Sequence, residues 1–322
     1  MISQIFCIPS QGNHNLLTLA KFRTNHQRGG GKGASYSIRL VIFFIMFVAG
    51  LLWIYKYISK DNTEPKYIPN YSIPAGATGD NRYYLPIPCK GQLVHHSQFS
   101  LCYNEADEEA SWVAYELTKK MLKLPNLPRK DRFEADTDIN TRSAKYGDYT
   151  GSGYTRGHLV PAADMSWNDT ALTQTFLMSN ITPQLSAFNG GIWRELEEDV
   201  RDWAFDDDRI FITSGPIFMD NQGSIGKQNK IRVPSHFFKA ILDIEGNDKK
   251  SIGFVIPNAM SELPLQEYAV TIDSIEKLTG LDLYPELLTQ ELEDKIESKM
   301  SLNDWRFSQK RYELRTKYWN NN

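Results

Sequence analysis

The sequence predicts an α+β domain with a central antiparallel sheet flanked by helices. Apolar residues alternate with other residues over 113–117, which is the period of a half-buried strand. Two later runs rich in Ile, Phe and Val, at 235–244 and 252–256, are joined by residues 245–248, a hairpin connection that makes them antiparallel neighbours. Between these groups, residues 193–203 carry the apolar stripe of an amphipathic helix. Grouped strands around a helical segment favour α+β over an alternating βαβ fold.

The remaining elements fit the same plan. Residues 210–213 form a further apolar strand, and the helical stripe consists of Trp193, Leu196, Val200 and Trp203 at steps of three, four and three. The segment 285–306 also has a helical pattern. We find no internal repeat and no second shift in composition, so we expect one domain over residues 81–318.

Composition gives only broad limits on function. The chain has 322 residues, of which 41% are hydrophobic and 23% charged, which is ordinary for a globular protein and excludes a disordered, collagen-like or disulfide-dense chain. The formal net charge is -3. A nucleic-acid coat protein would usually be basic, but an enzyme that grips a phosphate backbone briefly needs only a local positive groove. Net charge therefore does not exclude a nucleic-acid substrate.

A hydrophobic segment at residues 38–58 separates a flexible tail (1–37) from a linker (59–80) containing Pro65, Pro69 and Pro74. Its uncharged stretch is shorter than the ~20 residues of a comfortable spanning helix and longer than a typical signal-peptide core. We therefore expect a transmembrane anchor or a cleaved signal, with a buried core helix as the lesser alternative. Basic residues dominate before the segment, which predicts a cytosolic N-terminus and an exported domain.

Two of the three cysteines, Cys89 and Cys102, lie in the predicted domain, while Cys7 lies in the tail. The segment between Cys89 and Cys102, with Gly91 and His95-His96, looks like a turn joining two strands. In an oxidising compartment the pair could form a disulfide, and two buried thiols are the alternative.

Common catalytic signatures are absent from the sequence. It has no H-E-x-x-H or C-x-x-C pair, which makes a zinc site unexpected. It also lacks a G-x-S-x-G elbow, a Walker A loop and a G-x-G-x-x-G run. The missing motifs exclude the commonest classes of serine hydrolase, NTPase and dinucleotide-binding enzyme as functions of this chain.

The polar run at residues 151–164 is the first candidate site. Arg156 is suited to holding a phosphate oxygen, and His158 titrates near neutrality and could take a proton from water. Nearby glycines would let the backbone approach a ligand. Taken alone, a histidine among glycines is more often structural. His95 and His96 we interpret as loop residues, and His236 as a packed or surface histidine.

A second polar region follows at residues 178–201. Asn189 precedes the amphipathic helix, so it is either the N-cap of that helix or an amide oxygen ligand for Mg²⁺. Glu197 and Arg201 are one helical turn apart, which without further information indicates a surface ion pair.

These two regions together resemble the DNA/RNA non-specific endonucleases of the ββα-metal (His-Me finger) superfamily, which include mitochondrial endonuclease G and secreted bacterial nucleases. The resemblance lies in Tyr154-Thr-Arg-Gly-His-Leu-Val-Pro-Ala-Ala-Asp164, in Ser179-Asn-Ile-Thr-Pro-Gln184 and in the segment 189–197, in family order. Weaker similarity extends it over roughly residues 85–270. One departure is Thr155, where the family usually has Asp before Arg-Gly-His, so any support from that carboxylate must be supplied otherwise.

The resemblance implies a mechanism for phosphodiester hydrolysis. His158 would be the general base on the attacking water, and Asn189 the sole direct protein ligand of one Mg²⁺, for which Mn²⁺ can substitute. Arg156 would hold the phosphate, Arg201 would add charge stabilisation, and Glu197 would hydrogen-bond metal-bound waters. Asn180 would position the loop.

Contacts to sugar and phosphate alone would give weak sequence specificity, so the expected substrates are DNA, RNA or both. Two other functions stay open: an inactive membrane-tethered nucleic-acid-binding module, and a phosphodiesterase on smaller substrates. A homodimer is also possible. We expect the catalytic domain in a bacterial periplasm, at the cell surface or secreted, with the mitochondrial intermembrane space as the alternative.

Overall fold

The computed structural model describes residue 46, residues 82–246 and residues 248–321. The expected tail (1–37), linker (59–80) and nearly all of the hydrophobic segment (38–58) lie outside these residues. Within the described part of the chain, no helix combines the length and the apolar character needed to span a membrane.

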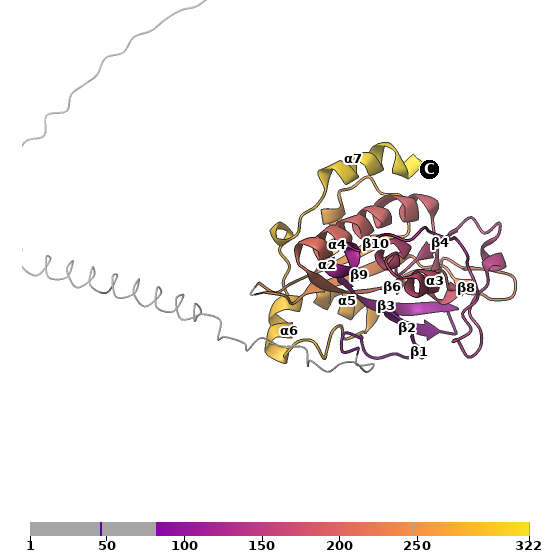
Figure 1. The fold of residues 1–322 in the computed structure, drawn as a ribbon, viewed down its shortest axis with the longest axis horizontal. Helices are drawn as coiled ribbons and strands as arrows, with labels where there is room; N and C mark the ends of the chain where they lie inside the picture. Colours follow the sequence, from indigo (N-terminus) through magenta and orange to yellow (C-terminus); the bar gives the residue numbers. More distant parts are fainter. Residues whose placement is uncertain (1–45, 47–81, 247, 322) are drawn as a thin grey trace, which may run out of the picture. The chain divides into compact units, whose positions relative to one another are not determined.

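A seven-stranded sheet, antiparallel at every pairing, forms the centre of the domain (Figure 1). Its strands, in spatial order, are β1 (Gln92–His95), β2 (Phe99–Asn104), β3 (Glu109–Thr118), β6 (Arg209–Ile217), β9 (His236–Asp243), β10 (Lys250–Pro257) and β11 (Ala269–Val270). Outside this sheet, β4 (Thr155–His158) pairs antiparallel with β5 (Ile181–Gln184), although helix α3 (Asp169–Gln174) lies between them in the chain, and β7 (Ser224–Ile225) forms a short hairpin with β8 (Ile231–Arg232). The predicted antiparallel α+β architecture is confirmed, including the hairpin between β9 and β10.

Helices cover both faces of this sheet. The α-helices are α2 (Lys119–Leu122), α3 (Asp169–Gln174), α4 (Arg194–Asp206), α5 (Ile272–Thr279), α6 (Gln290–Glu297) and α7 (Gln309–Lys317). Short 3₁₀ turns are η1 (Tyr146–Tyr149), η2 (Ala162–Met165), η3 (Met178–Asn180), η5 (Leu265–Tyr268), η6 (Leu302–Asp304) and η7 (Trp319–Asn321), and a π-helical turn, η4, spans Phe188–Trp193. In Figure 1, α4 and α7 lie on one side of the sheet and α5 and α6 on the other.

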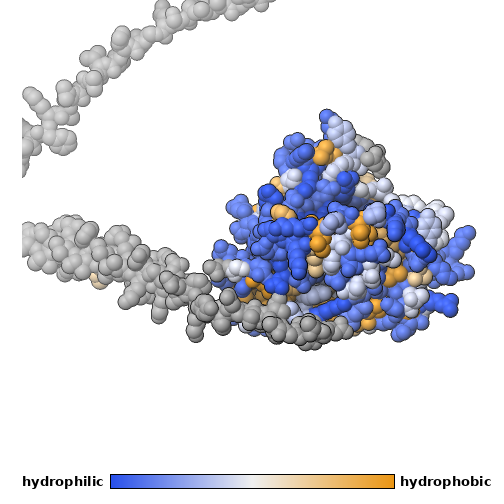
Figure 2. Space-filling view, viewed as in Figure 1, coloured by the Kyte–Doolittle hydropathy of each residue, from blue (hydrophilic) through white to orange (hydrophobic). Residues whose placement is uncertain are grey.

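Strand β3 shows how the two layers are built. Tyr115 packs in the core that also contains Leu196 of α4, whereas Trp112 packs in the core that contains Ile275 of α5. Successive side chains of a strand point to opposite faces, so β3 supplies both cores at once. The strand is therefore buried on both faces rather than half-buried as its alternation indicated. The face of the domain seen in Figure 2 is mainly hydrophilic, with hydrophobic residues scattered over it.

The predicted apolar stripe places α4 on the sheet. Its members are at most 2% exposed: Trp193, Leu196, Val200 and Trp203. Each such burial stabilises the fold by roughly 1.5–3 kcal/mol. The stripe therefore sets which side of α4 packs on the sheet.

The C-terminal part differs from the prediction in two ways. The helical pattern at 285–306 corresponds to α6 and η6 with a break between them, and a further helix, α7, follows. The fold also continues past residue 318, because the buried Asn320 donates from Nδ2 to the backbone oxygen of Ser261 at 2.8 Å.

The edge strand β1 and its neighbour β2 flank the turn that the sequence indicated. Cys89 and Cys102 form a disulfide with a Cα–Cα distance of 5.6 Å. The interpretation of His96 as a loop residue misses its burial: it is 2% exposed, and its Nε2 lies 3.2 Å from Asp136 Oδ2. Ser179 donates to the same carboxylate oxygen at 2.5 Å, which connects this edge to the segment before β5.

Candidate functional site

The antiparallel strand pair β4–β5 presents Arg156 and His158 on one face of β4. The register pairs Thr155 with Gln184 and His158 with Ile181, and residues two apart on a strand point the same way. Gly157 lies between them with its Cα against β5, where a Cβ would be 2.0 Å from the Gln184 side chain. Glycine suits this position because any side chain here would have to displace the buried side chain of Gln184.

The imidazole of His158 lies in an aromatic surrounding. Its ring centroid is 5.0 Å from that of Phe176, edge-on, and 5.6 Å from that of Phe133, and the residue is 8% exposed. Its Nε2 has no hydrogen-bond partner among the residues described. Burial, and next the nearby charge of Arg129, lower the pKa of His158 from 6.5 to about 3. The imidazole is therefore neutral at neutral pH and can accept a proton.

Arg156 is held by stacking. Its guanidinium carbon is 3.7 Å from the ring centroid of Tyr146 and 5.5 Å from that of Phe133. Phe133 thus contacts both Arg156 and His158 and links the two predicted site residues. Sequence reasoning missed Phe133 and Tyr146, although Phe133 is the one apolar residue in the charged run 129–134.

The structure excludes the N-cap alternative for Asn189. This residue lies inside the π-helical turn η4, and Trp193 occupies the N-cap position of α4. Asn189 instead donates from Nδ2 to Thr155 Oγ1 at 3.0 Å, and Thr155 Oγ1 donates to the Gln184 backbone oxygen at 2.9 Å. Thr155 therefore supplies polar support at the position where the family resemblance predicted a carboxylate.

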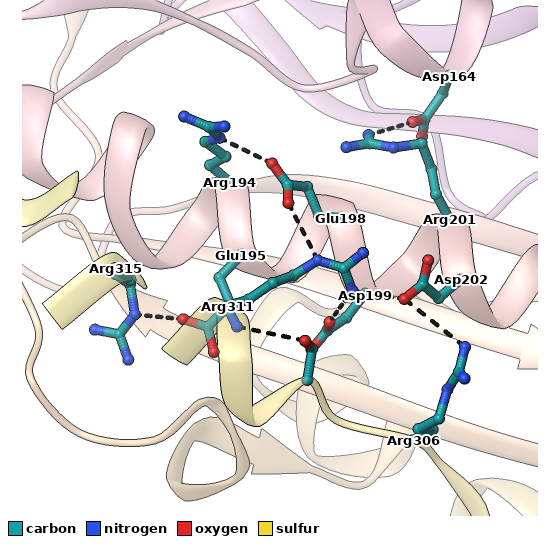
Figure 3. Close-up of polar contacts among 11 residues, drawn as sticks. Asp164, Arg194, Glu195, Glu198, Asp199, Arg201, Asp202, Arg306, Arg311 and Arg315 are labelled. Carbon is teal, nitrogen blue, oxygen red and sulfur yellow. Dashed lines mark hydrogen bonds and ion pairs between the residues drawn. The ribbon is translucent and has the colours of Figure 1, made fainter. Parts of the chain in front are cut away.

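The expected surface ion pair between Glu197 and Arg201 is wrong. Arg201 Nη1 binds Asp164 Oδ1 at 2.8 Å, as Figure 3 shows, and the other oxygen of this fully buried carboxylate accepts from the Tyr115 hydroxyl at 2.7 Å. Asp164, which lies in η2 after β4, is thus the carboxylate in contact with Arg201, whereas Glu197 acts on Arg201 only through its charge. Asp164 is the last residue of the Arg-Gly-His run, but no role was predicted for it.

Glu197 faces a second group that sequence reasoning missed. Lys239 of β9 is fully buried, its Nζ lies 4.7 Å from the Trp193 ring centroid, and it has no hydrogen-bond partner in the described chain. Burial raises the pKa of Glu197, and the positive charges of Lys239 and Arg201 oppose this rise. Burial likewise lowers the pKa of Lys239. A lysine within the otherwise apolar residues 237–242 was the signal available in the sequence.

Asn180 is buried and binds backbone on both sides. Its Oδ1 accepts from the Val160 amide at 2.9 Å, and its Nδ2 donates to the backbone oxygens of Val160 at 3.1 Å and Thr175 at 2.9 Å. It joins the loop after His158 to the end of α3. His236, by contrast, is a half-buried residue at the start of β9 whose Nδ1 lies 3.1 Å from Ser235 Oγ.

The C-terminal helix supports α4 and the turn that carries Asn189. Arg315 is fully buried and donates to Glu195 Oε2 at 2.5 Å (Figure 3). At η4, a Cβ on Gly191 would lie 2.7 Å from Asn320 Oδ1, so the C-terminal turn η7 packs directly on this glycine. Sequence reasoning assigned α7 no structure and no role.

Comparison with known proteins identifies the family of the chain. The profile of the DNA/RNA non-specific endonuclease family matches residues 80–290. Human mitochondrial endonuclease G is 32% identical over 217 residues, covering 63% of this chain and 73% of that protein. Nuclease C1 of Cunninghamella echinulata var. echinulata is also 32% identical, covering 63% of this chain and 86% of that protein.

A solved structure shares the fold. The crystal structure of the EndoG/EndoGI complex, described as showing the mechanism of EndoG inhibition, aligns with a TM-score of 0.59 at 28% identity, covering 65% of this chain and 91% of that chain. The chain belongs to the DNA/RNA non-specific endonuclease family.

Proposed function

We propose that this endonuclease hydrolyses DNA and RNA with His158 as general base and with one Mg²⁺ held by Asn189. The observation that carries the proposal is the hydrogen bond from Asn189 Nδ2 to Thr155 Oγ1, because Thr155 is on the strand that presents Arg156 and His158. It ties the candidate metal ligand to the candidate base within one β-β-helix unit.

The residues around Asn189 fit a magnesium ion. With its Nδ2 directed to Thr155, the amide offers Oδ1, a hard oxygen of the kind Mg²⁺ prefers, and Mg²⁺ needs few protein ligands because it keeps several waters. Glu197 is suited to accept hydrogen bonds from such waters, and Lys239 favours its ionised form. When bound, the metal supplies Lewis-acid stabilisation of the developing phosphate charge and an acidified water for the leaving oxygen.

His158 is proposed to take the proton of the attacking water. Phe133 and Phe176 fix the ring, and desolvation keeps it neutral. A bound phosphodiester brings negative charge beside the ring, which favours the protonated form and raises the pKa of His158 when substrate is present. The base would thus become stronger in the complex that needs it.

The two arginines are proposed to hold the phosphate. The contact with the Tyr146 ring positions the guanidinium of Arg156, whose several N–H donors suit a phosphate. Arg201 is anchored by Asp164 at one nitrogen and is 22% exposed, so its remaining donors can reach a substrate. Both charges would then stabilise the transition state.

Location is proposed from the relatives. Several are named as mitochondrial, including those from human and Saccharomyces cerevisiae, and these favour the mitochondrial alternative over a bacterial envelope. The membrane anchor or signal expected at 38–58 lies almost wholly outside the described residues and stays a prediction.

The test uses the full-length chain with supercoiled plasmid and with RNA, in Mg²⁺ or EDTA. His158→Ala should abolish metal-dependent cleavage of both substrates. His95→Ala is the matched control, since this exposed histidine lies on the edge strand β1, and it should cleave like the wild type. Binding without cleavage by the wild type, or cleavage of a small chromogenic diester alone, would replace the proposal with one of the two alternative functions.

A further inference from the structure

Three carboxylates converge between α5 and α6, on the sheet face opposite α4. Asp273 and Glu276 are three residues apart on α5 and therefore share one side of that helix, while Glu297 ends α6. One ligand oxygen from each lies within 4.8 Å of the others. Like charges at this spacing repel one another unless a cation or protons neutralise them.

The buried member of the cluster lacks a partner. Glu297 is 2% exposed, and its Oε1 has no hydrogen-bond partner in the described chain. The charged groups that act on it are all acids, namely Glu276, Glu293, Asp273 and Asp282. Burial and then these neighbours raise the pKa of Glu297 to about 9. Without a cation this side chain must stay protonated to avoid an unpaired buried charge, and a cation among the three carboxylates would bind its ionised form and occupy the unpartnered Oε1.

The chemistry of the cluster selects the ion. We propose that Asp273, Glu276 and Glu297 form a calcium site. Ca²⁺ takes six to eight oxygen ligands in flexible geometry, whereas Mg²⁺ usually takes one or two carboxylates and keeps its waters. The absence of histidine or cysteine from the cluster disfavours zinc and copper.

Two details of the cluster suit a dedicated site. Glu276 Oε1 accepts from the Leu283 amide at 2.7 Å, which fixes the side chain and leaves its other oxygen for the ion. Asp282, whose Oδ1 is also buried without a partner among the residues described, and Glu293 supply further carboxylates nearby. The ion would therefore balance the negative charge of these two neighbouring carboxylates as well as that of its three proposed ligands.

The site has a structural consequence. Helix α6 is fixed to β10 by the Ser251 hydroxyl, which donates to the Ile296 backbone oxygen at 2.9 Å, and α5 packs Ile275 against Gly253 of the same strand. The calcium ion would join these two helices to each other. Because they cover the face opposite α4, the ion would stabilise the fold without entering the nuclease centre.

Thermal unfolding of the full-length chain tests the proposal. Every protein carries Asn189→Ala, so that calcium has no ligand at the proposed catalytic metal position. Millimolar calcium, compared with EDTA, should raise Tm by roughly 3–6 °C in this background. Glu297→Gln should lose the shift, and so should Asp273→Asn, an exposed substitution that keeps the test valid if Glu297→Gln does not fold. The matched control is Glu291→Gln, an exposed acid on α6, which should keep the full shift.

Two results would overturn the calcium site. The first is no calcium-dependent shift in the Asn189→Ala background. The second is a shift of equal size in Asp273→Asn and in Glu291→Gln, because general screening of acidic charge would act on both. Neither result bears on the nuclease mechanism, which is tested separately by cleavage.

Discussion

The amide of Asn189 donates to the hydroxyl of Thr155 at 3.0 Å, across the gap between a π-helical turn and a β-strand. Thr155 in turn donates to the backbone of Gln184 at 2.9 Å, so its hydroxyl proton is already used and its lone pair faces Asn189. The orientation of the Asn189 side chain is thereby set by a neutral residue. Aspartate, usual in the family at this position, could accept the same bond.

Removing the Thr155 hydroxyl should weaken metal binding without unfolding the site. In Thr155→Val the side-chain volume is nearly kept, but Asn189 loses its acceptor and is no longer held in one orientation. We expect the metal concentration for half-maximal cleavage to rise about 10- to 100-fold. Titration of plasmid cleavage with Mg²⁺ measures this, with Thr155→Ser as the control that should stay close to wild type. An unchanged titration in Thr155→Val would refute the role of the hydroxyl.

Adding one methyl group at Gly157 should disturb the packing between β4 and β5. A Cβ there would lie 2.0 Å from the buried Gln184 side chain, so this side chain must be displaced from its packed position or the strands must separate. We expect Gly157→Ala to destabilise the fold by about 1–3 kcal/mol and to reduce cleavage strongly. Gly147→Ala is the control, because a Cβ at Gly147 meets nothing within 4 Å. Denaturant unfolding of both variants checks the difference, and equal stabilities would contradict the packing.

The buried histidine should make the fold sensitive to acid. The folded-state pKa of His158 is about 3 against an ordinary 6.5, so the unfolded chain binds this proton first as the pH falls. The neutral His158 therefore contributes fully to the free energy of unfolding above pH 6.5. This contribution is lost progressively toward pH 3, by up to about 1.4 kcal/mol per pH unit. Unfolding free energies measured between pH 6.5 and ~4 should therefore fall less steeply in His158→Gln than in the wild type. Parallel curves would show that His158 titrates normally in the folded protein.

Loss of Arg315 should destabilise the domain through α4. Its fully buried guanidinium donates to Glu195 Oε2 (Figure 3). It also donates to the backbone oxygens of Ser261 and Leu263. Arg315→Ala leaves the Glu195 carboxylate buried and unpaired, which we expect to cost about 3–5 kcal/mol. Lys310→Ala on the exposed side of α7 should change stability by less than about 0.5 kcal/mol. Similar losses in the two variants would show that the buried pair is not the cause.

Periodicity predicted the elements that bury a regular face. The stripe of α4 and the β9–β10 hairpin could be recognised because apolar side chains repeat at the spacing of the element. Helix α7 has no such stripe: it is mostly polar and charged, and it is held by Arg311 and Arg315 binding carboxylates of α4. Those partners lie more than a hundred residues away in sequence, so no local pattern could indicate them.

The site could be predicted as a set of residues but not as a set of contacts. Motif order identified Arg156, His158 and Asn189, while spacing along α4 paired Arg201 with Glu197, four residues before it. The fold instead brings Asp164 to Arg201 and Lys239 toward Glu197, from a loop and from a strand. Such pairings depend on tertiary structure, which overrides helical spacing when a buried carboxylate needs a partner.

The proposal that Asn189 holds the metal is best tested by plasmid cleavage. Cleavage is measured as a function of Mg²⁺ concentration for the wild type and for Asn189→Ala. We predict that the wild type is inactive in EDTA and saturates with Mg²⁺, whereas Asn189→Ala stays inactive across the same range while retaining the wild-type Tm measured without metal. Cleavage by Asn189→Ala at the wild-type rate and with the wild-type Mg²⁺ dependence would contradict the claim that Asn189 holds the metal.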